Sequence, residues 1–527
     1  ACPGGGSAPG EAWPGQRQWQ RLEAAGYRLG RLTIEVDDVY VGDSLAWYQR
    51  LANDLHPDTD PGVVRDLLLV APDQPVQAER IYEAERALRA QEFLTAARIV
   101  PVRCEGDRVD AEVRVRDAWT LQASVGLGSA GGESTGSFGF EDDNFLGTGK
   151  RVLLEWEEGR ERDTVEIGYN DPALFGSDWT LGLSHRELSD GSGDAVSLRY
   201  PFRAADQRWS FRADLEEATS ELEFEQAGDT AFEAELDSER AELELRRLVA
   251  RDGHAGWRVG AGWRRDHAEF GRLETRRADL RPPPELADRR LQGPFLSLER
   301  FDDRFRSYRN LRRMGKTEDY DLGFDVRLLG GRYTAAEGDA EPWFVDLFAR
   351  HGLAIGRDDL LLTRLRLSGR FSDERGSEAV YRSLGADYYH RTSERNTVVV
   401  HGELDWRSEL DPEDELYLGG FDGLLAYPDR FRVGDRRWQL HLEDRYVSDT
   451  VLFDTIQVGY TGYLEAGRIR GLDGRWSRTL ANVGFGLRLG SLRSSFGSIT
   501  YLTLAAPLVD AGQEDDYAVV VGSTVNF

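Results

Sequence analysis

Hydrophobic and polar positions alternate with a period of two along most of the chain after Trp119. The segments 438–443 and 483–490 place apolar side chains on one face and polar, charged or glycine positions on the other. Successive side chains of a β-strand point to opposite sides of the sheet, so this period is typical of strands. The chain beyond residue 118 therefore predicts a large antiparallel sheet.

Residues 29–117 follow a mixed pattern. The segment 32–36 alternates like a strand, 61–68 and 76–89 carry apolar residues at helical spacing, and 98–102 and 109–115 alternate again. Pro61 suits the first turn of a helix, where a missing N–H costs nothing. The order predicts a small β-α-α-β-β domain, and the glycine-rich residues 1–28 predict a flexible leader.

Three features favour a transmembrane β-barrel over a soluble sandwich for residues 118–527. The alternating segments run about 10 residues, the length of a tilted strand that crosses a bilayer. Their polar faces are crowded with Arg, Glu, Asp and His, as a watery lumen allows. Ten of the 13 tryptophans lie beyond residue 118, many near strand ends, as in an aromatic girdle. We expect a mainly β protein with a C-terminal antiparallel barrel.

Two charged stretches interrupt the alternation. Residues 272–290 mix arginines with three consecutive prolines and predict a long loop. Residues 219–238 are rich in glutamate, and two interpretations stay open for them: an exposed loop, or a solvated continuation of the strands. The alternating segments from residue 119 to 527 number 18 to 20, and two interpretations stay open for the highest counts: every segment is a wall strand, or some are hairpins that project beyond the membrane.

Charge and composition exclude several classes of protein. With 94 acidic and 66 basic side chains, the net charge of −28 argues against nucleic-acid binding, which needs a basic face. The cysteines, Cys2 and Cys104, allow at most one disulfide and make neither a disulfide scaffold nor a zinc site. The G-x-G-x-x-G match at 126–131 and the G-x-S-x-G match at 132–136 lack the following helix that those sites require. We expect no enzyme activity, no cofactor and no metal.

Four motifs in order resemble those of one family. They are Glu141-Asp142-Asp143-Asn144-Phe145-Leu146-Gly147-Thr148-Gly149-Lys150, the segment 418–428, Tyr463-Leu464-Glu465-Ala466-Gly467, and the terminal Phe527. Together with the small domain, they are similar to the BamA/TamA superfamily, outer-membrane assembly and secretion barrels preceded by periplasmic POTRA domains. The resemblance implies one POTRA-like domain at 29–117, a barrel of about 16 strands at 118–527, and a sixth loop inserted in the lumen near 412–435.

The resemblance also implies the residues that brace this loop against the barrel. They are Gly419, Gly420, Gly423, Leu425, Tyr427 and Pro428 in the loop, with Glu443 and Glu465 on the wall. The family carries an arginine where this chain has Leu425, and a leucine cannot make a charge-assisted contact. Two interpretations stay open: Arg430 or Arg432 reaches Glu443 or Glu465 instead, or the loop packs without an arginine.

The barrel must close where its first and last strands meet. We expect this seam between the strand that starts near Trp119 and the one that ends at Phe527, because open strand edges are costly in lipid. Gly522 either loosens the seam or faces the lumen beneath an aromatic ring. An oxidising periplasm would permit a disulfide between Cys2 and Cys104.

The preferred function is insertion or translocation of protein substrates in the bacterial outer membrane without ATP, with the POTRA-like domain in the periplasm. The expected partners are outer-membrane lipid and an unfolded or partly folded protein client, which could add a strand to an exposed sheet edge, or a dedicated partner protein. Nucleic acid is not an expected partner. The alternatives are a non-conducting barrel scaffold that anchors a partner protein, and a passive channel or lipid-handling barrel.

Overall fold

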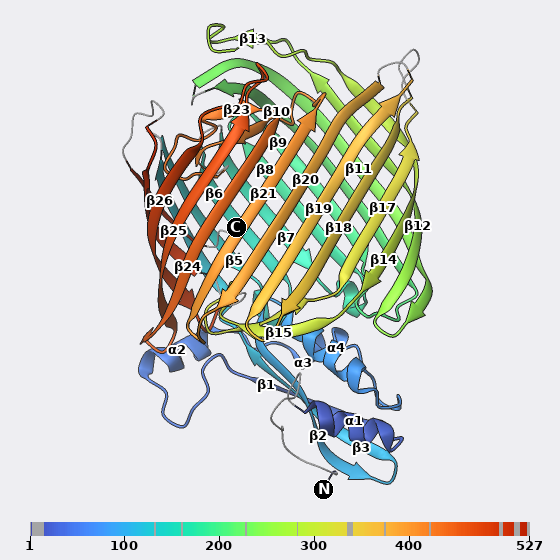
Figure 1. Cartoon of the computed structure of the whole chain (residues 1–527). Helices are drawn as coiled ribbons and strands as arrows, with labels where there is room; N and C mark the ends of the chain where they lie inside the picture. The colour runs from blue at the N-terminus through green and yellow to red at the C-terminus, as the bar shows by residue number, and fades with distance from the viewer. Residues whose placement is uncertain are drawn as a thin grey trace.

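The protein consists of a closed β-barrel and a small domain at one of its ends (Figure 1). The computed structural model describes residues 2, 15–130, 133–159, 162–226, 229–281, 283–334, 341–373, 376–420, 423–494, 499–510 and 517–523. Among the helices of these residues, none has the length and apolar character needed to cross a membrane. We call the barrel end that carries the domain proximal and the opposite end distal.

Twenty strands of the described residues form the barrel wall, each antiparallel to its neighbours. They are β4 (Leu121–Ala130), β5 (Glu133–Asp142), β6 (Arg151–Glu158), β7 (Asp163–Asp171), β8 (Thr180–Leu188), β9 (Gly191–Tyr200), β10 (Trp209–Gln226), β11 (Asp229–Asp252), β12 (Ala255–Phe270), β14 (Arg289–Asp302), β17 (Phe324–Arg332), β18 (Trp343–Ile355), β19 (Asp359–Ser372), β20 (Gly376–Arg391), β21 (Asn396–Ser408), β24 (Arg436–Leu452), β25 (Ile456–Arg470), β26 (Leu480–Ser491), β27 (Ile499–Pro507) and β28 (Ala518–Ser523). The two-residue strand β13 (Glu274–Thr275) pairs with β11 past the end of β12.

The barrel fold is confirmed, but the expected number of about 16 strands is wrong. Five wall strands follow the loop at 412–435, and fifteen precede it. That loop is therefore the eighth distal connection rather than the sixth. The additional alternating segments are paired wall strands on both sides, not hairpins that project from the barrel, so the pattern count of 18 to 20 contained the correct number.

Strand β26 shows how alternation builds the wall. Asn482, Gly484 and Arg488 are buried and point inward, whereas Val483 and Phe485 are exposed on the outside. The same division recurs around the barrel, so exposed Val, Leu, Phe and Trp side chains form an apolar outer belt. A polar interior inside an apolar belt is the arrangement of a barrel that faces lipid.

Strands β10 and β11 are the longest of the wall, with 18 and 24 residues. Their register runs without interruption from Trp209↔Arg247 to Leu222↔Ala234. Residues 219–226 and 229–238 therefore continue the two strands and do not form a loop. Residues 272–290 contain the predicted loop, which packs Leu273, Leu280 and Leu286 against the tip of the β10–β11 hairpin.

The small domain contains a three-stranded sheet and helices. Its elements are α1 (Gln16–Ala24), β1 (Arg28–Asp37), α2 (Trp47–Leu55), α3 (Pro61–Asp66), α4 (Ala78–Arg89), β2 (Leu94–Glu105) and β3 (Arg108–Asp117). The sheet order is β1-β3-β2, with β1 parallel and β2 antiparallel to β3. The expected order β-α-α-β-β lacked one helix, α2.

The expected flexible leader is wrong for residues 16–24, which form α1. Trp19 and Leu22 lie three positions apart and are buried in the domain core, and Trp19 Nε1 donates to the Ile99 carbonyl at 3.1 Å. Two apolar residues make too narrow a stripe for a helix to be recognised from the pattern. Cys2 forms a disulfide with Cys104 on β2 (Cα–Cα 5.0 Å), which ties the start of the chain to the sheet.

The turn between β5 and β6 joins the barrel to the domain. Asp60 N donates to the Gly147 carbonyl at 2.9 Å, and Asn144 Nδ2 donates to Thr59 Oγ1 at 2.7 Å. Gly147 has a φ of +74°, and a Cβ there would lie 2.2 Å from the Asp58 carbonyl oxygen. Only glycine fits this approach, so the segment 141–150 acts as the docking surface for the domain.

Candidate functional site: the lumen and its two inserted segments

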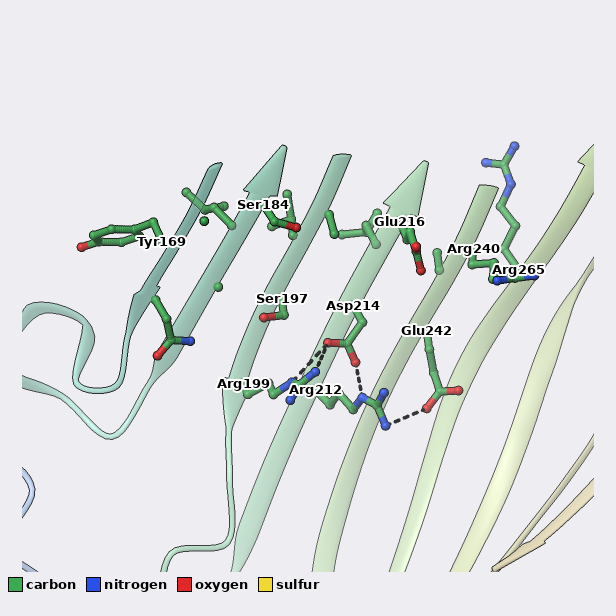
Figure 2. Close-up of a pocket in the computed structure, with 18 of the residues that line it drawn as sticks. Tyr169, Ser184, Ser197, Arg199, Arg212, Asp214, Glu216, Arg240, Glu242 and Arg265 are labelled. Atoms are coloured by element: carbon green, nitrogen blue, oxygen red, sulfur yellow. Dashed lines mark hydrogen bonds and ion pairs between the residues drawn. The ribbon is translucent and has the colours of Figure 1, made fainter. Parts of the chain in front are cut away.

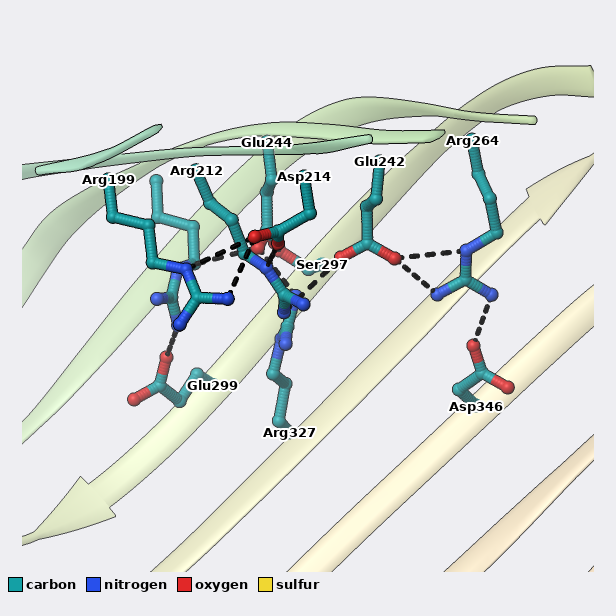
Figure 3. Close-up of polar contacts among 11 residues, drawn as sticks. Arg199, Arg212, Asp214, Glu242, Glu244, Arg264, Ser297, Glu299, Arg327 and Asp346 are labelled. Carbon is teal, nitrogen blue, oxygen red and sulfur yellow. Dashed lines mark hydrogen bonds and ion pairs between the residues drawn. The ribbon is translucent and has the colours of Figure 1, made fainter. Parts of the chain in front are cut away.

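The inner wall from β9 to β18 carries a ladder of arginines and carboxylates (Figure 3). Asp214 accepts hydrogen bonds from Arg199 (2.8 Å) and Arg212, and Glu242 lies 2.8 Å from Arg264. A second row consists of Arg246, Arg258, Arg327, Glu244, Ser297 and Glu299. Because arginine and carboxylate form strong charge-assisted hydrogen bonds, the ladder keeps a polar wall internally neutralised.

Two of the cavities among the described residues lie inside the barrel. The larger, about 730 Å³, follows the ladder and is lined by arginines, carboxylates and the hydroxyl groups of Tyr169, Ser184 and Ser197 (Figure 2). The smaller, about 320 Å³, lies against the opposite wall and is lined by residues including His401, Gln439 and Leu424. Both have a mixed lining, in which charged and hydroxyl groups alternate with aliphatic side chains.

Residues 409–435, which we call the distal loop, enter the lumen between β21 and β24. The loop includes the short strands β22 (Leu416–Leu418) and β23 (Arg432–Gly434), which pair with each other. At its root it packs into a buried apolar cluster on the inner wall. The cluster comprises Leu416, Leu418, Leu424, Tyr427, Phe431, Ile469 and Leu480.

Tyr427 is the centre of this attachment and is fully buried. Its hydroxyl donates toward the carbonyls of Ala481 (2.9 Å) and Val509 (2.8 Å). Nearby, Leu425 packs against a cluster containing Tyr463, and its backbone N–H donates to Glu465 Oε2 at 3.3 Å. The loop is thus fixed by apolar packing, a buried tyrosine and a backbone donor.

The glycines of the loop are required by its path. Gly419, Gly420 and Gly423 have φ values of +129°, +57° and +96°. A Cβ on Gly420 would lie 2.5 Å from Asp429 Cα, and one on Gly419 would lie 2.4 Å from the Pro428 carbonyl oxygen. Left-handed backbone and such close approach both favour glycine.

His441 lies on the inner wall between Glu465 and Glu443, the two residues expected to brace the loop. Its Nδ1 is 2.9 Å from Glu465 Oε1, its Nε2 is 3.4 Å from Glu443 Oε2, and Asn482 Nδ2 donates to Glu465 at 2.8 Å. Glu443 also contacts Arg445 at 2.6 Å. The alternation at 438–443 predicts only that His441 lies on the polar face of its strand. Its contact with Glu465 depends on the strand register, which pairs the two residues directly and which the sequence alone does not specify.

The far side of the distal loop is held by ion pairs. Arg281 Nη1 donates to Glu415 at 2.8 Å, and Arg370 donates to both oxygens of Asp411 at 2.7 and 2.5 Å. Arg430 lies 3.9 Å from Glu225 on β10, across the lumen from Glu465. This placement favours the interpretation in which the loop packs without an arginine lock at Glu465.

Residues 303–323, which we call the proximal hairpin, cross the lumen at the other end. The hairpin contains β15 (Phe305–Arg309) and β16 (Thr317–Asp321), which pair with each other. It starts at the β14–β17 edge and its tip reaches β24–β26: Arg445 donates to the Leu311 carbonyl at 3.0 Å and Arg488 to the Arg312 carbonyl at 3.1 Å. Figure 1 shows β15 lying across the proximal mouth.

The tip of the hairpin fits against glycines of the wall. A Cβ on Gly459 or Gly490 would lie 2.7 Å from atoms of the Met314 side chain. Lys316 donates to the Ser494 carbonyl, and burial together with Arg313 lowers the pKa of Lys316 to about 7. The proximal hairpin therefore fills this end of the barrel. Within the described residues, its two strands pair with each other and not with the wall.

Helix α4 of the small domain holds the base of the hairpin. Arg89 Nη2 lies 2.9 Å from Asp319, the Arg86 guanidinium lies 3.6 Å from the Phe305 ring centroid, and Tyr82 Oη lies 3.4 Å from Ser307 Oγ. The same helix contacts the β9–β10 turn through Arg80 and Asp206. The domain thus contacts directly the segment that closes the lumen.

The seam joins β28 to β4 through Val519↔Ser129, Val520↔Gly128 and Val521↔Leu127. Gly522 pairs with Tyr501 of β27, and both belong to the inward-facing set, so the glycine faces the lumen opposite an aromatic residue. Trp119 precedes β4 and its N–H donates to the Arg493 carbonyl at 2.6 Å. Phe527 lies outside the described residues.

Comparisons with known proteins concern shape alone. No family model matches the chain, and no curated protein matches it in sequence. Among solved structures it is similar to CdiB from Acinetobacter baumannii (12% identity, TM-score 0.44, 94% of this chain and 74% of that one). It is also similar to CdiB from Escherichia coli (14%, 0.44, 94% and 76%) and to BamA from Haemophilus ducreyi lacking POTRA domains 1–3 (14%, 0.38, 94% and 85%).

Proposed function

We propose that this chain is an outer-membrane barrel that inserts or translocates protein clients without ATP, and that its small domain controls access to the lumen. The observation that carries the proposal is the direct attachment of α4 to the proximal hairpin. A barrel of this strand number encloses an aqueous space wider than side chains alone can fill. In this proposal the hairpin, which reaches from the β14–β17 edge to β24 and β26, closes that space at the proximal end.

The domain offers a place for a client to bind. Strand β2 is one edge of its sheet, and α1 and α4 cover that edge: Glu85 accepts from Ile99 N at 2.8 Å and Trp19 donates to the Ile99 carbonyl. Strand β1 is the other edge, and in the described residues its segment 33–37 pairs with β3 alone. An extended client segment could add to β1 as a further strand.

In this proposal, client binding at β1 and opening of the proximal mouth are linked through the small domain. A client that adds to β1 extends the sheet on which α4 packs. Three residues of α4 contact the hairpin: Arg89, Arg86 and Tyr82. A shift of α4 withdraws these contacts and releases the hairpin, while the distal loop stays braced by Tyr427. Client binding then opens the proximal mouth without nucleotide hydrolysis.

The test is a deletion strain compared with its parent by quantitative proteomics of the outer membrane and the culture medium. Loss of many barrel proteins identifies an insertase, and loss of one secreted or surface protein identifies a dedicated exporter. Complementation with wild type should restore the lost proteins. If neither pool changes, the transport proposal is contradicted.

A further inference from the structure

Helix α2 has an apolar face that the domain does not use. Trp47, Leu51 and Leu55 recur every four residues and therefore lie on one side of the helix, where they are 70%, 48% and 67% exposed. The opposite side of the helix is fixed. Gln49 is buried, the Asn53 side-chain amide donates to the Tyr40 carbonyl, and the Asn53 side-chain oxygen accepts from the Tyr40 N–H. A helix with one anchored polar side and one exposed apolar side is suited to an interface.

The helix is fastened to the proximal rim of the barrel. Tyr40 Oη lies 2.8 Å from Thr455 Oγ1, Gln49 Nε2 donates to Asp454 at 3.4 Å, and the Tyr48 ring packs edge-on against Phe453. These three barrel residues form the β24–β25 turn, and Figure 1 shows α2 beside that part of the rim. The helix is thus placed by the barrel and not only by its own domain.

The apolar face continues the outer belt of the barrel. Val451 and Leu452 at the end of β24 are exposed, and Phe453 follows them at 71% exposure. Other turns of the same rim also present apolar side chains: Leu146 is exposed, and Phe175 is 97% exposed. Exposure of these apolar side chains to water is unfavourable. Together they form an apolar band around the proximal end of the barrel.

We propose that α2 is an interfacial anchor that buries Trp47, Leu51 and Leu55 in the lipid leaflet next to the proximal rim. The inference rests on the proposed membrane location of the barrel. The partner is a zwitterionic phospholipid surface, because Asp38, Asp43, Asp54 and Asp58 around the helix disfavour an anionic one. The anchor holds the small domain at a fixed height, so that α4 remains in reach of the proximal hairpin.

The experiment uses the full chain in phosphatidylcholine vesicles that contain lipid with a nitroxide quencher on its acyl chain. A cysteine at Leu51 carries a fluorophore, while Cys2 and Cys104 stay protected by their disulfide. Arg50→Cys, one residue away and on the polar side, is the matched control. Phe485→Cys, on the outer face of β26, reports whether the barrel itself is inserted.

We expect the label at position 51 to be quenched at least 3-fold more strongly than the label at position 50, and independently of salt. Trp47→Ser with Leu55→Ser, both at exposed positions, should remove most of that quenching. Equal, weak quenching at 50 and 51 with strong quenching at 485 would overturn the anchor and leave the barrel proposal intact. Weak quenching at 485 as well would overturn both.

Discussion

The two segments that enter the lumen differ in which parts of the molecule hold them. The distal loop is rooted in a cluster of seven buried apolar residues that includes Tyr427, and it is pinned on its far side by arginine–carboxylate pairs. The proximal hairpin is also rooted in buried apolar clusters, through Tyr308, Leu311 and Met314, and in addition its base is held by α4 through Arg89 and Arg86. Contacts with a second domain can be exchanged when that domain moves, whereas contacts within the barrel wall cannot. We therefore propose that the loop is a brace and the hairpin a gate.

Removal of the gate should have the largest effect. Replacement of residues 306–320 by a short Gly-Ser linker leaves β14 and β17 paired but empties the proximal mouth. We expect single-channel conductance in planar bilayers to rise at least 10-fold over wild type, because a barrel of this size otherwise encloses a continuous aqueous path. Unchanged conductance would mean that the hairpin does not block the lumen.

Damage to the brace should cost folding stability instead. Tyr427→Ala removes a fully buried ring and two hydrogen bonds, and we expect the free energy of unfolding to fall by about 4 kcal/mol. Urea titration of the reconstituted barrel measures this loss. Leu472→Ala, at an exposed position of the next distal loop, is the control and should change stability by less than about 0.5 kcal/mol. Equal midpoints for the two variants would contradict the role of Tyr427.

The small domain should respond to pH through Glu85. Burial raises the pKa of Glu85 to about 7 although Ile99 N–H and Arg89 favour its charged form. Because the pKa in the folded domain exceeds that of the unfolded chain, the domain loses stability as pH rises from about 4.5 to 7, and the loss is constant above that range. We expect a loss of about 3 kcal/mol.

Hydrogen exchange at the α4 and β2 amides of the full chain measures this loss. Glu85→Gln keeps an acceptor for Ile99 N–H without the charge, so its protection should vary less with pH than that of wild type. An identical pH dependence in both proteins would contradict the assignment to Glu85.

The smallest expected effect separates two contacts of the same helix. Arg89→Ala removes the ion pair to Asp319 of the hairpin, and we expect an approximately 5-fold higher probability of opening, which corresponds to about 1 kcal/mol. Arg80→Ala removes the contact to Asp206 in the β9–β10 turn and should leave the opening probability unchanged. Equal effects of the two substitutions on channel recordings would mean that α4 acts on the barrel as a whole.

The wall of the barrel could be predicted from the sequence because alternation is a local property. The alternation alone assigns Val483 and Phe485 to one face of their strand and Arg488 to the other, without information on the neighbouring strands. The proximal hairpin could not be predicted, because β15 and β16 alternate like wall strands and only their partners distinguish them. The predicted number of about 16 strands came from the resemblance and was too low, whereas the count of 18 to 20 alternating segments includes the observed 20 wall strands.

The position of the brace was a prediction from the resemblance, and its chemistry was not predicted. The glycines and Tyr427 were named from the motif, and the missing arginine was noted at Leu425. The contacts that hold the loop in place of an arginine could not be predicted from the sequence. His441 contacts Glu465 on the neighbouring strand, and the carbonyls that accept from Tyr427 lie 54 and 82 residues away. Contacts of such long range depend on register and loop path, which a single sequence does not specify.

The central claim, a moving hairpin beside a fixed loop, is tested most directly by cross-linking each segment to the wall. Met314→Cys with Val447→Cys fixes the hairpin, and Leu424→Cys with Ile469→Cys fixes the distal loop, in both cases with a short reversible thiol cross-linker between residues of one buried cluster. Opening is then recorded in bilayers before and after release, with wild type under the same reductant as the control. We predict that the first cross-link abolishes opening reversibly and the second leaves it unchanged. Loss of opening with the loop fixed, and normal opening with the hairpin fixed, would contradict the account.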